Sequence, residues 1–272
     1  MVRGLKIRRR LKPRLHKRCP PPRCKENNIF LPPILQPAEA GFVCVAANSI
    51  RPVFLNESIS NNTIGEIVDK REEITIAEYQ ATAESFLQGT WHHDVSQNRN
   101  ALTAAMPRNP GKILDIGCGP GRDLVAFKSQ GHTVVGLDAT PAFVEIAKEL
   151  SGCEVLQQSF LNLDLPKAEF DGIFANASMI HVPSDKMVKV LQDLHKTLVI
   201  GGAIVMSMCR GNWEGYDERP TGKRYTAGWE YETLTPCLEQ AGFAIVNHYY
   251  RPPGLPREAQ SWVVIVGKKN LT

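Results

Sequence analysis

Short apolar runs alternate with segments of helical periodicity from about residue 112 to the end of the chain. Apolar runs of this length predict buried strands, and the periodic segments between them predict helices. Strands that alternate with helices form a doubly wound, mostly parallel sheet that binds ligands at the carboxyl ends of its strands. We predict strands over residues 112–116, 132–138, 154–157, 171–176, 203–209, 243–250 and 261–267, and helices over residues 121–130, 141–150, 184–198 and 230–241.

Two further helices are expected ahead of the first strand, over residues 74–87 and 95–105, where they would form an N-terminal helical cap. In the first of them, apolar residues spaced by three or four predict one buried stripe, formed by Ile76, Tyr79, Ala83 and Phe86. The residues before Ile74 show no sustained periodicity and include a proline cluster. We therefore expect a basic, proline-rich disordered extension over residues 1–72 and one folded domain over residues 73–272.

Positive charge is concentrated at the start of the chain. Residues 1–25 hold eleven Lys or Arg and no acid, although the net charge of all 272 residues is only +4. The rest of the chain therefore has a net charge of −7, which argues against a nucleic-acid-binding surface. The basic start is either an organelle-targeting segment or a solvated tail. The small residues 44–47 favour processing, whereas the absence of serine before Ser49 is atypical of a transit peptide.

No stretch approaches the roughly 20 apolar residues that span a bilayer, and the start lacks the apolar core of a secretory signal. We expect a cytoplasmic protein that has no membrane partner, with organelle import through the basic N-terminus as the alternative. The seven cysteines are odd in number and scattered, which argues against a disulfide framework. The spacing of Cys19 and Cys24 does not suit a zinc knuckle, and we expect no metal.

A strand, a glycine turn and a helix follow one another between residues 113 and 123. Asp115 stands at the strand end, and Gly117, Gly119 and Gly121 follow at alternate positions. Glycine lets the backbone pass close to a ligand, and the next helix directs its positive end to the same place. We expect the N–H groups of Gly117 and Gly119 to face a nucleotide-like ligand. The spacing differs from the Gly-x-Gly-x-x-Gly of dinucleotide-binding oxidoreductases, which are the less favoured alternative.

A second acid, Asp138, ends the next predicted strand. With this acid and the Asp-x-Gly-x-Gly-x-Gly spacing, the sequence resembles the class I S-adenosylmethionine (SAM) methyltransferases. The resemblance implies SAM as cofactor, with its methionine part on the glycine loop and its ribose hydroxyls on Asp138. It also implies that Ala139, Ser159 and Phe160 lie along the adenosine. Two alternatives stay open: Asp138 also suits a helix N-cap, and Phe160 also suits the core.

The same resemblance implies a Rossmann-like, doubly wound, mostly parallel seven-stranded sheet with an antiparallel edge strand, which agrees with the two closing strands. Asn176 and His181 follow the fourth strand, where the methyl group passes to its acceptor in these enzymes. We expect Asn176 at both donor and acceptor, and His181 as a general base, an acceptor-orienting group or a structural histidine. The Asn/Asp-Pro-Pro-aromatic motif of nucleic-acid base methyltransferases is absent there.

Four segments narrow the resemblance, and two of them, residues 78–98 and residues 248–257, are particular rather than common among methyltransferases. The first includes Gly-Thr-Trp-His-His-Asp-Val-Ser-Gln-Asn, and the last reads His-Tyr-Tyr-Arg-Pro-Pro-Gly-Leu-Pro-Arg. With residues 113–124 and 170–178, they resemble the C-terminal domain of the ovothiol-biosynthesis enzyme, which methylates a ring nitrogen of thiohistidine (4-mercaptohistidine N1-methyltransferase). That enzyme carries an iron-dependent sulfoxide synthase region ahead of this domain. Here we expect a freestanding methyltransferase for a small-molecule acceptor, which a separate sulfoxide synthase would supply.

A thiohistidine acceptor requires the site to present a ring nitrogen, rather than the more nucleophilic sulfur, to the methyl group, and only geometry can do this. The carboxylate of its amino-acid end suits a bidentate arginine. Arg251 is the first candidate, while Arg219 and Arg224 are alternatives, and each also suits a solvated surface charge. From the cap we expect Tyr79 to contact the donor. Two alternative functions stay open: methylation of a different small-molecule acceptor, or SAM binding without catalysis.

Overall fold

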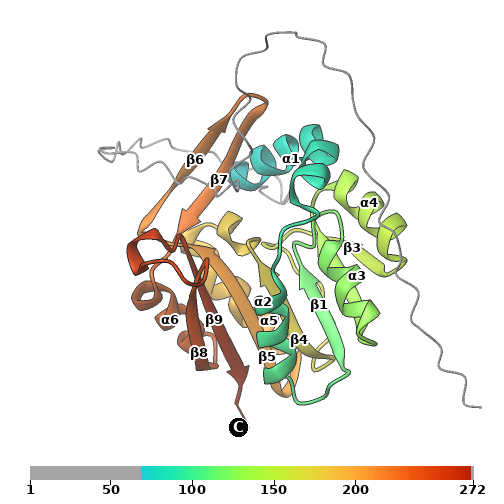
Figure 1. Cartoon of the computed structure of the whole chain (residues 1–272), viewed down its shortest axis with the longest axis vertical. Coiled ribbons are helices and arrows are strands. Elements are labelled where there is room, and N and C mark those ends of the chain that lie inside the picture. The colour runs from blue at the N-terminus through green and yellow to red at the C-terminus, as the bar shows by residue number, and fades with distance from the viewer. Residues whose placement is uncertain (1–68, 271–272) are drawn as a thin grey trace, which may run out of the picture. The chain divides into compact units, whose positions relative to one another are not determined.

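The computed structural model describes residues 69–270, and the expectations for residues 1–68 lie outside this part of the chain. A seven-stranded sheet has the order β3-β2-β1-β4-β5-β9-β8, and a separate hairpin pairs β6 with β7 (Figure 1). The strands are β1 Lys112–Ile116, β2 Thr133–Asp138, β3 Glu154–Gln157, β4 Phe170–Asn176, β5 Leu198–Cys209, β6 Trp213–Arg219, β7 Gly222–Gly228, β8 Phe243–Arg251 and β9 Trp262–Lys269.

Every pairing in the large sheet from β3 to β5 is parallel. Helices cross from β1 to β2, from β2 to β3 and from β4 to β5, whereas residues 158–169 connect β3 to β4 without a helix. β9 runs antiparallel to β5 and to the edge strand β8. The predicted fold class, a Rossmann-like, mostly parallel seven-stranded sheet with an antiparallel edge, is therefore confirmed. The strand order reverses between β1 and β4, and in such sheets ligands bind at the carboxyl ends of the strands beside this reversal.

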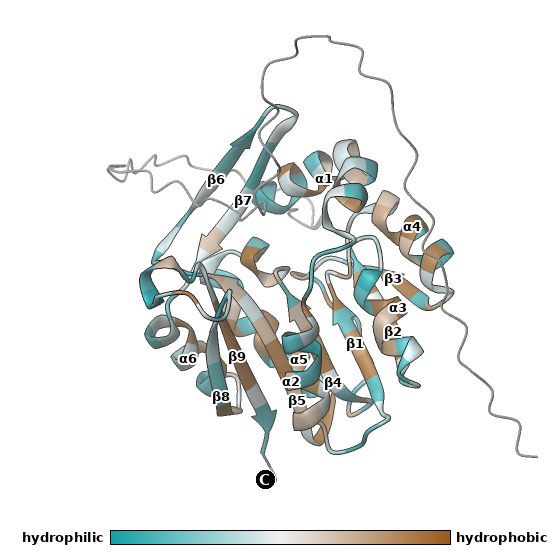
Figure 2. Ribbon diagram, in the orientation of Figure 1, coloured by the Kyte–Doolittle hydropathy of each residue, from teal (hydrophilic) through white to brown (hydrophobic). Residues whose placement is uncertain are grey.

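Helices cover both faces of the sheet, so the domain has three layers (Figure 1). The helices are α1 Lys70–Thr90, α2 Ser96–Ala105, α3 Arg122–Ser129, α4 Pro141–Ser151, α5 Met187–Thr197 and α6 Tyr231–Gln240. In β1, Ile113 packs with α2, α3 and α4 on one face, whereas Leu114 and Ile116 pack with α5 and α6 on the other. The strands between the helices are the most hydrophobic part of the ribbon (Figure 2). Successive residues of β1 thus point into the two opposite layers of helices.

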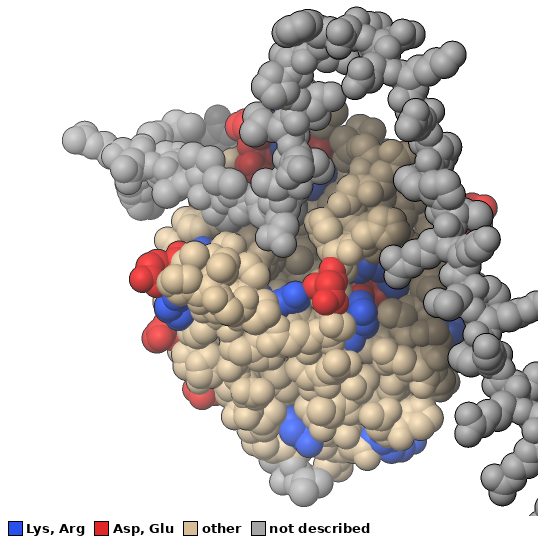
Figure 3. Space-filling model, viewed as in Figure 1, with Lys and Arg blue, Asp and Glu red and all other residues tan. Residues whose placement is uncertain are grey.

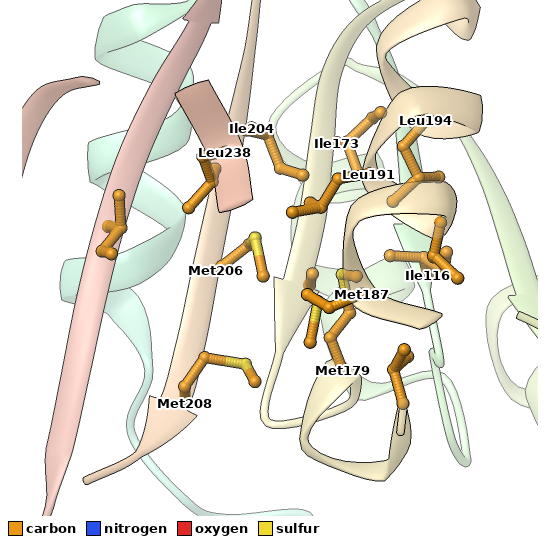
Figure 4. Packing of buried hydrophobic residues seen from close by; sticks show 14 of the residues in the cluster. Ile116, Ile173, Met179, Met187, Leu191, Leu194, Ile204, Met206, Met208 and Leu238 are labelled. Carbon is orange, nitrogen blue, oxygen red and sulfur yellow. The ribbon is translucent and has the colours of Figure 1, made fainter. Parts of the chain in front are cut away.

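Methionines fill much of the core beneath the ends of β4 and β5. Figure 4 shows Met179, Met187, Met206 and Met208 in this layer with Ile116 and Ile173, and all four methionines are fully buried. Met179 belongs to the short 3-10 turn Met179–His181, which follows β4. Because methionine adapts to irregular space, this layer anchors the turn that carries His181.

α1 and the hairpin lie at the carboxyl ends of the parallel strands (Figure 1). α1 begins at Lys70, four residues before its predicted start, so the expected boundary between residues 72 and 73 falls inside this helix. The Asp69 carboxylate caps it by accepting the Arg71 N–H at 2.9 Å. The first turn is polar and acidic, and apolar periodicity therefore could not reveal it.

The buried stripe predicted for this helix is only partly correct. Ala83 is buried, but its three predicted partners are partly exposed. Thr75 and Glu78 are buried in their place, because this side of α1 packs on the polar strand β7: the Thr75 hydroxyl, for example, accepts the Tyr225 N–H at 2.9 Å.

The segment between β5 and α6, in which no strand or helix was predicted, forms the hairpin β6–β7. Its strands are rich in polar residues and lack the apolar alternation that marks a strand, and Arg224 and Thr226 are among its buried residues. The helix predicted over residues 184–198 starts as a short 3-10 turn, and α5 proper begins at Met187.

Among residues 69–270, no helix combines the length and apolar character needed to cross a membrane. In the same part of the chain, no three or more His, Cys, Asp or Glu side chains come together as metal ligands would.

Candidate active site

The glycine turn after β1 is tied to β2. The N–H groups of Gly117 and Cys118 both donate to the Leu137 carbonyl, at 2.7 and 3.0 Å, and the Gly119 N–H donates to Asp138 Oδ2 at 2.9 Å. The expectation that the Gly117 and Gly119 N–H groups face a ligand is therefore wrong. They close the turn against the neighbouring strand, and this pairing depends on the β1–β2 register rather than on the local motif.

Glycine is required in this turn for close approach. All three glycines have positive φ, and a Cβ on Gly117 would lie 2.4 Å from Ser178 Cβ. A Cβ on Gly119 would instead meet nothing nearer than Phe86 Cε1 of α1, at 3.8 Å. Gly117 therefore lets the loops after β1 and β4 touch, while Gly119 faces the space beneath α1.

Asp115 is a buried carboxylate that lacks a partner on one side. Asp115 is the penultimate residue of β1 and is only 3% exposed, and its Oδ2 has no hydrogen-bond partner among the described residues. Burial, with the nearby Asp123 carboxylate, raises the pKa of Asp115 well above its usual value, and Arg122 opposes this shift. A buried, unpaired carboxylate oxygen at a ligand site suits a cationic ligand group.

An arginine pair that the sequence reasoning missed lies next to Asp115. Arg99 of α2 and Arg122 of α3 both donate to Asp123, at 2.6 Å each, and the Arg122 Nε is buried without a hydrogen-bond partner among residues 69–270. Arg122 also donates to the Thr90 carbonyl at the end of α1, at 3.0 Å. The acid in the first turn of α3 was the available signal, because such a buried acid needs a cationic partner.

Asp138 is not the N-cap of α4, because Thr140 has that position, but its buried carboxylate holds the turn between β2 and α4. Besides the Gly119 N–H, its carboxylate accepts the N–H of Thr140, the N-cap of α4, at 2.8 Å. Each carboxylate oxygen keeps a second lone pair for a ligand hydroxyl. Burial raises the Asp138 pKa, and these N–H donors oppose the rise. Ala139, directly after it, is partly exposed between two buried residues.

Ser159 and Phe160 lie against the cap and the glycine turn. The Ser159 hydroxyl lies 2.7 Å from both carboxylate oxygens of Glu72 in α1. Phe160 Cζ would lie 2.9 Å from a Cβ on Gly117, so its ring borders the turn. Burial raises the Glu72 pKa, which the Ser159 hydroxyl opposes. Glu72 is a site residue that sequence reasoning missed, since it falls in the polar first turn of α1.

Tyr79 stands at the centre of the cap. Its ring centroid lies 5.3 Å from that of Phe86, 5.4 Å from that of Phe143 and 5.4 Å from that of His181. The next residue, Gln80, accepts the Ala142 N–H of α4 at 2.9 Å. α1 therefore reaches the loops after β1, β2, β3 and β4, all of which border the carboxyl edge of the sheet.

Of the three predicted catalytic residues, His181 lies between the cap and the hairpin, whereas Asn176 and Arg251 bond to residues in or just before α2. His181 bonds to the cap, through the Tyr79 hydroxyl at 2.8 Å, and to the hairpin, through the Tyr225 carbonyl at 2.7 Å. Asn176 accepts a hydrogen bond from Asn98 of α2 at 2.7 Å. Arg251 donates to the Asp94 carbonyl at 2.7 Å, just before α2, and its Nε is buried without a hydrogen-bond partner in the described chain.

The two alternative arginines lie in the hairpin. Arg224 is 5% exposed, pairs with Glu78 of α1 and stacks its guanidinium 3.8 Å above the Tyr79 ring. The reading of Arg224 as a solvated charge is therefore wrong. Arg219 pairs with Asp217 on the same hairpin. Just before α2, the Asp94 carboxylate accepts the N–H of Ser96, the first residue of the helix, at 2.8 Å.

A doubly wound sheet of this order, with an Asp-x-Gly-x-Gly-x-Gly turn after β1 and a buried acid at the end of β2, defines a class I methyltransferase site. Residues 113–202 match the family model described as a methyltransferase domain. The chain is 31% identical to an uncharacterized methyltransferase of Synechocystis, over 52% of this chain and 72% of that protein. It therefore belongs to the SAM-dependent methyltransferases, and SAM is its cofactor.

Other relatives differ in what they methylate. An 18S rRNA (guanine-N(7))-methyltransferase of Schizosaccharomyces pombe is 29% identical over 40% of this chain, and the match spans only 45% of that enzyme's length. The Burkholderia thailandensis 1,6-didemethyltoxoflavin-N1-methyltransferase, solved with its substrate and S-adenosylhomocysteine, superposes with a TM-score of 0.60 at 21% identity. That superposition covers 78% of this chain and 94% of the other, and it shows a shared fold.

Proposed function

We propose that this methyltransferase acts on a small molecule and that its acceptor is a ring nitrogen of a thiohistidine. The support is a contact between residues 78–98 and residues 248–257, the two segments on which the resemblance to the ovothiol-biosynthesis enzyme depends. The Tyr249 hydroxyl donates to Asn98 Oδ1 at 2.9 Å, and Arg251 donates to the Asp94 carbonyl, so residues 78–98 touch residues 248–257. Asn98 in turn bonds Asn176 at the end of β4. Residues about 150 positions apart thus converge beside the edge where methyl transfer occurs in this class.

The described residues suit SAM at chemically distinct points. We assign Asp115 to its cationic amino group, Asp138 to its ribose hydroxyls, and Ser159 with Phe160 to its adenine. Ala139 and the turn of Gly117, Gly119 and Gly121 would border it, and Tyr79 would cover it from α1. When bound, SAM supplies a methyl group on a positively charged sulfur. The residues around it would hold the donor, exclude water and fix the direction of attack.

A small acceptor agrees with how the site is covered. α1 and the hairpin close over the carboxyl edge, with Glu78 and Arg224 buried between them. On the face shown in Figure 3, charged side chains of both signs lie scattered and form no continuous basic patch over the described residues. Nucleic-acid binding depends on such a patch, so we assign the acceptor to small molecules.

Regioselectivity is the main task of an acceptor site for thiohistidine, because sulfur is the better nucleophile. An anchor at the amino-acid end would keep sulfur out of line with the methyl group. Arg251 is suited to this role, because its buried Nε still has a hydrogen to donate. The 1,6-didemethyltoxoflavin-N1-methyltransferase, which shares the fold, is by its name a methyltransferase for a nitrogen of a small molecule.

The test is incubation of the purified protein with SAM and 4-mercaptohistidine, with histidine as the matched acceptor that lacks sulfur. Mass spectrometry and NMR should locate the new methyl group on a ring nitrogen of 4-mercaptohistidine. Methylation of sulfur, or no transfer to this acceptor while SAM binds, would refute the proposed acceptor. Adding a sulfoxide synthase and its substrates would then show whether a separate enzyme can supply the acceptor.

A further inference from the structure

A chain of hydrogen bonds fixes the direction in which His181 and Tyr79 donate. The Tyr225 carbonyl oxygen only accepts, so the His181 Nδ1 at 2.7 Å must carry a hydrogen. Burial lowers the pKa of His181 to about 4, so the ring is neutral at physiological pH and Nε2 has no hydrogen. The Tyr79 hydroxyl, 2.8 Å from Nε2, must then donate to it. The only hydrogen of this hydroxyl is thereby used.

The surroundings of Tyr79 prevent the opposite arrangement. Burial raises its pKa to about 12, so the hydroxyl stays protonated. The Arg224 guanidinium is stacked 3.8 Å over one side of the ring, and Phe86 and Phe143 pack against it. Arg224 is itself held by Glu78, and its Nη2 lies 3.3 Å from the Thr82 hydroxyl. These contacts hold the Tyr79 ring in place, so its hydroxyl keeps its single hydrogen on His181 Nε2. The Tyr79 oxygen can therefore only accept a hydrogen bond from a ligand.

We propose that Tyr79 selects the acceptor by accepting a hydrogen bond from its N–H, and that Arg224 is a positioning residue for Tyr79. This inference rests on the proposed function. In an imidazole, one nitrogen carries the hydrogen and the other carries the lone pair. If Tyr79 binds the N–H nitrogen, the second nitrogen is left as the nucleophile, and the choice between the two ring nitrogens is made by the direction of one hydrogen bond.

The reaction balances without a protein base. The lone pair of the second nitrogen forms the bond to the methyl carbon, the carbon–sulfur bond breaks towards sulfur, and the ring's N–H proton is later released to water. Positive charge develops on the ring during transfer, so its N–H becomes a better donor to Tyr79. The hydrogen bond is then stronger in the transition state than in the ground state, which is the condition for catalysis.

Tyr79→Phe tests the proposal, because it keeps the packed ring and removes only the oxygen. With 4-mercaptohistidine we expect kcat to fall at least tenfold, the Kd of SAM to stay within twofold, and a larger share of product methylated on the other ring nitrogen. Tyr216→Phe is the matched control: it removes a hydroxyl from the exposed side of the hairpin and should change none of these values. Unchanged kcat and isomer ratio in Tyr79→Phe would overturn the proposal.

A second measurement does not depend on the acceptor. NMR of the full chain with ¹⁵N-labelled histidine should show His181 with hydrogen on Nδ1 and none on Nε2 from pH 5.5 to 8, with the signal assigned by its loss in His181→Gln. Hydrogen on Nε2 would reverse the polarity of Tyr79 and overturn the inference whatever the acceptor. If the NMR result agrees but 4-mercaptohistidine is not methylated, the proposed acceptor is wrong and the tautomer selection fails with it.

The role of Arg224 has its own readout. Arg224→Lys keeps the charge beside Glu78 but loses the planar stack on Tyr79. With the same thiohistidine acceptor, we expect kcat to fall several-fold while KM changes little, together with the same shift in isomer ratio as in Tyr79→Phe. A purely structural role would lower thermal stability and leave the isomer ratio unchanged, and that result would overturn the positioning assignment.

Discussion

Glu78 and Arg224 form an ion pair in which both side chains are almost completely buried, with residue exposures of 4% and 5%. Glu78 lies in α1 and Arg224 in β7, so the pair joins the cap to the hairpin above the carboxyl edge of the sheet. The Thr221 hydroxyl also donates to Glu78 Oε1, at 2.8 Å. The cap and the hairpin are thus held together by a polar contact that shapes one side of the site.

Removing one member of this pair should destabilise the protein strongly. Glu78→Gln leaves the Arg224 charge buried without its counterion, and broken buried pairs cost about 3–5 kcal/mol. Urea unfolding should show a loss in this range. The matched control is Asp193→Asn, which breaks exposed pairs with Lys189 and Lys196 and should cost less than about 1 kcal/mol. Equal losses in the two variants would contradict the assignment of a buried pair.

Asp115→Asn should separate stability from donor binding. At neutral pH the buried, unpartnered carboxylate opposes folding, as the raised pKa of Asp115 indicates, so the neutral variant should unfold at an equal or higher temperature. The same change removes the charge assigned to the amino group of SAM and should raise the Kd of SAM tenfold or more, about 1.4 kcal/mol. Thermal denaturation and isothermal titration measure the two effects.

Asp138→Ala is the comparison for this experiment. Asp138 accepts the Gly119 and Thr140 N–H groups, so its loss should lower stability as well as raise the Kd of SAM at least tenfold. If Asp115→Asn instead destabilises the protein without weakening SAM binding, Asp115 is a structural residue and its assigned role is wrong. Unchanged SAM binding in Asp138→Ala would likewise remove Asp138 from the donor site.

Local signals explain which parts of the molecule could be predicted from the sequence. The bounds of β1 and β3 are as predicted, because apolar runs between turn residues mark buried strands. Asp115 and Asp138 were placed at the ends of two neighbouring strands for the same reason, since each follows an apolar run. These features depend on residues within a few positions of one another, and the parallel sheet brings them together by its regular geometry.

The missed features depend on contacts between distant residues. Glu78 and Arg224 are 146 positions apart, and each is buried only because the other compensates its charge. The hairpin therefore has polar strands that no apolar alternation could reveal. The N–H groups of Gly117 and Gly119 were misassigned because their partners lie on β2, and a motif read along one strand does not show them. The polar start of α1 was missed for a similar reason.

The stability of the protein should depend on pH through His181. Its pKa is about 4 in the folded chain and about 6.5 when unfolded, so between these values the unfolded state binds more protons. Stability should therefore fall as the pH drops from 6.5 to 4, by about 3 kcal/mol from this residue. The difference between wild type and His181→Gln in unfolding free energy, measured across this range, isolates the effect. A pH-independent difference would show that His181 titrates normally.

The start of the folded domain can be located by two deletions that differ by five residues. A chain that begins at Asp69 keeps the cap of α1, the Arg71 pair with Asp185 and the Glu72 bond to Ser159. It lacks the eleven basic residues of the start, which have no part in the proposed site. We therefore expect it to retain methyl transfer, with a Kd of SAM within twofold of that of the full chain. A chain that begins at Ile74 follows the boundary expected from periodicity and loses all three contacts. Loss of the cap alone costs about 1 kcal/mol, and the missing Glu72 should also weaken SAM binding. Loss of activity in the chain that begins at Asp69 would instead show that residues 1–68 take part in catalysis or in binding the acceptor.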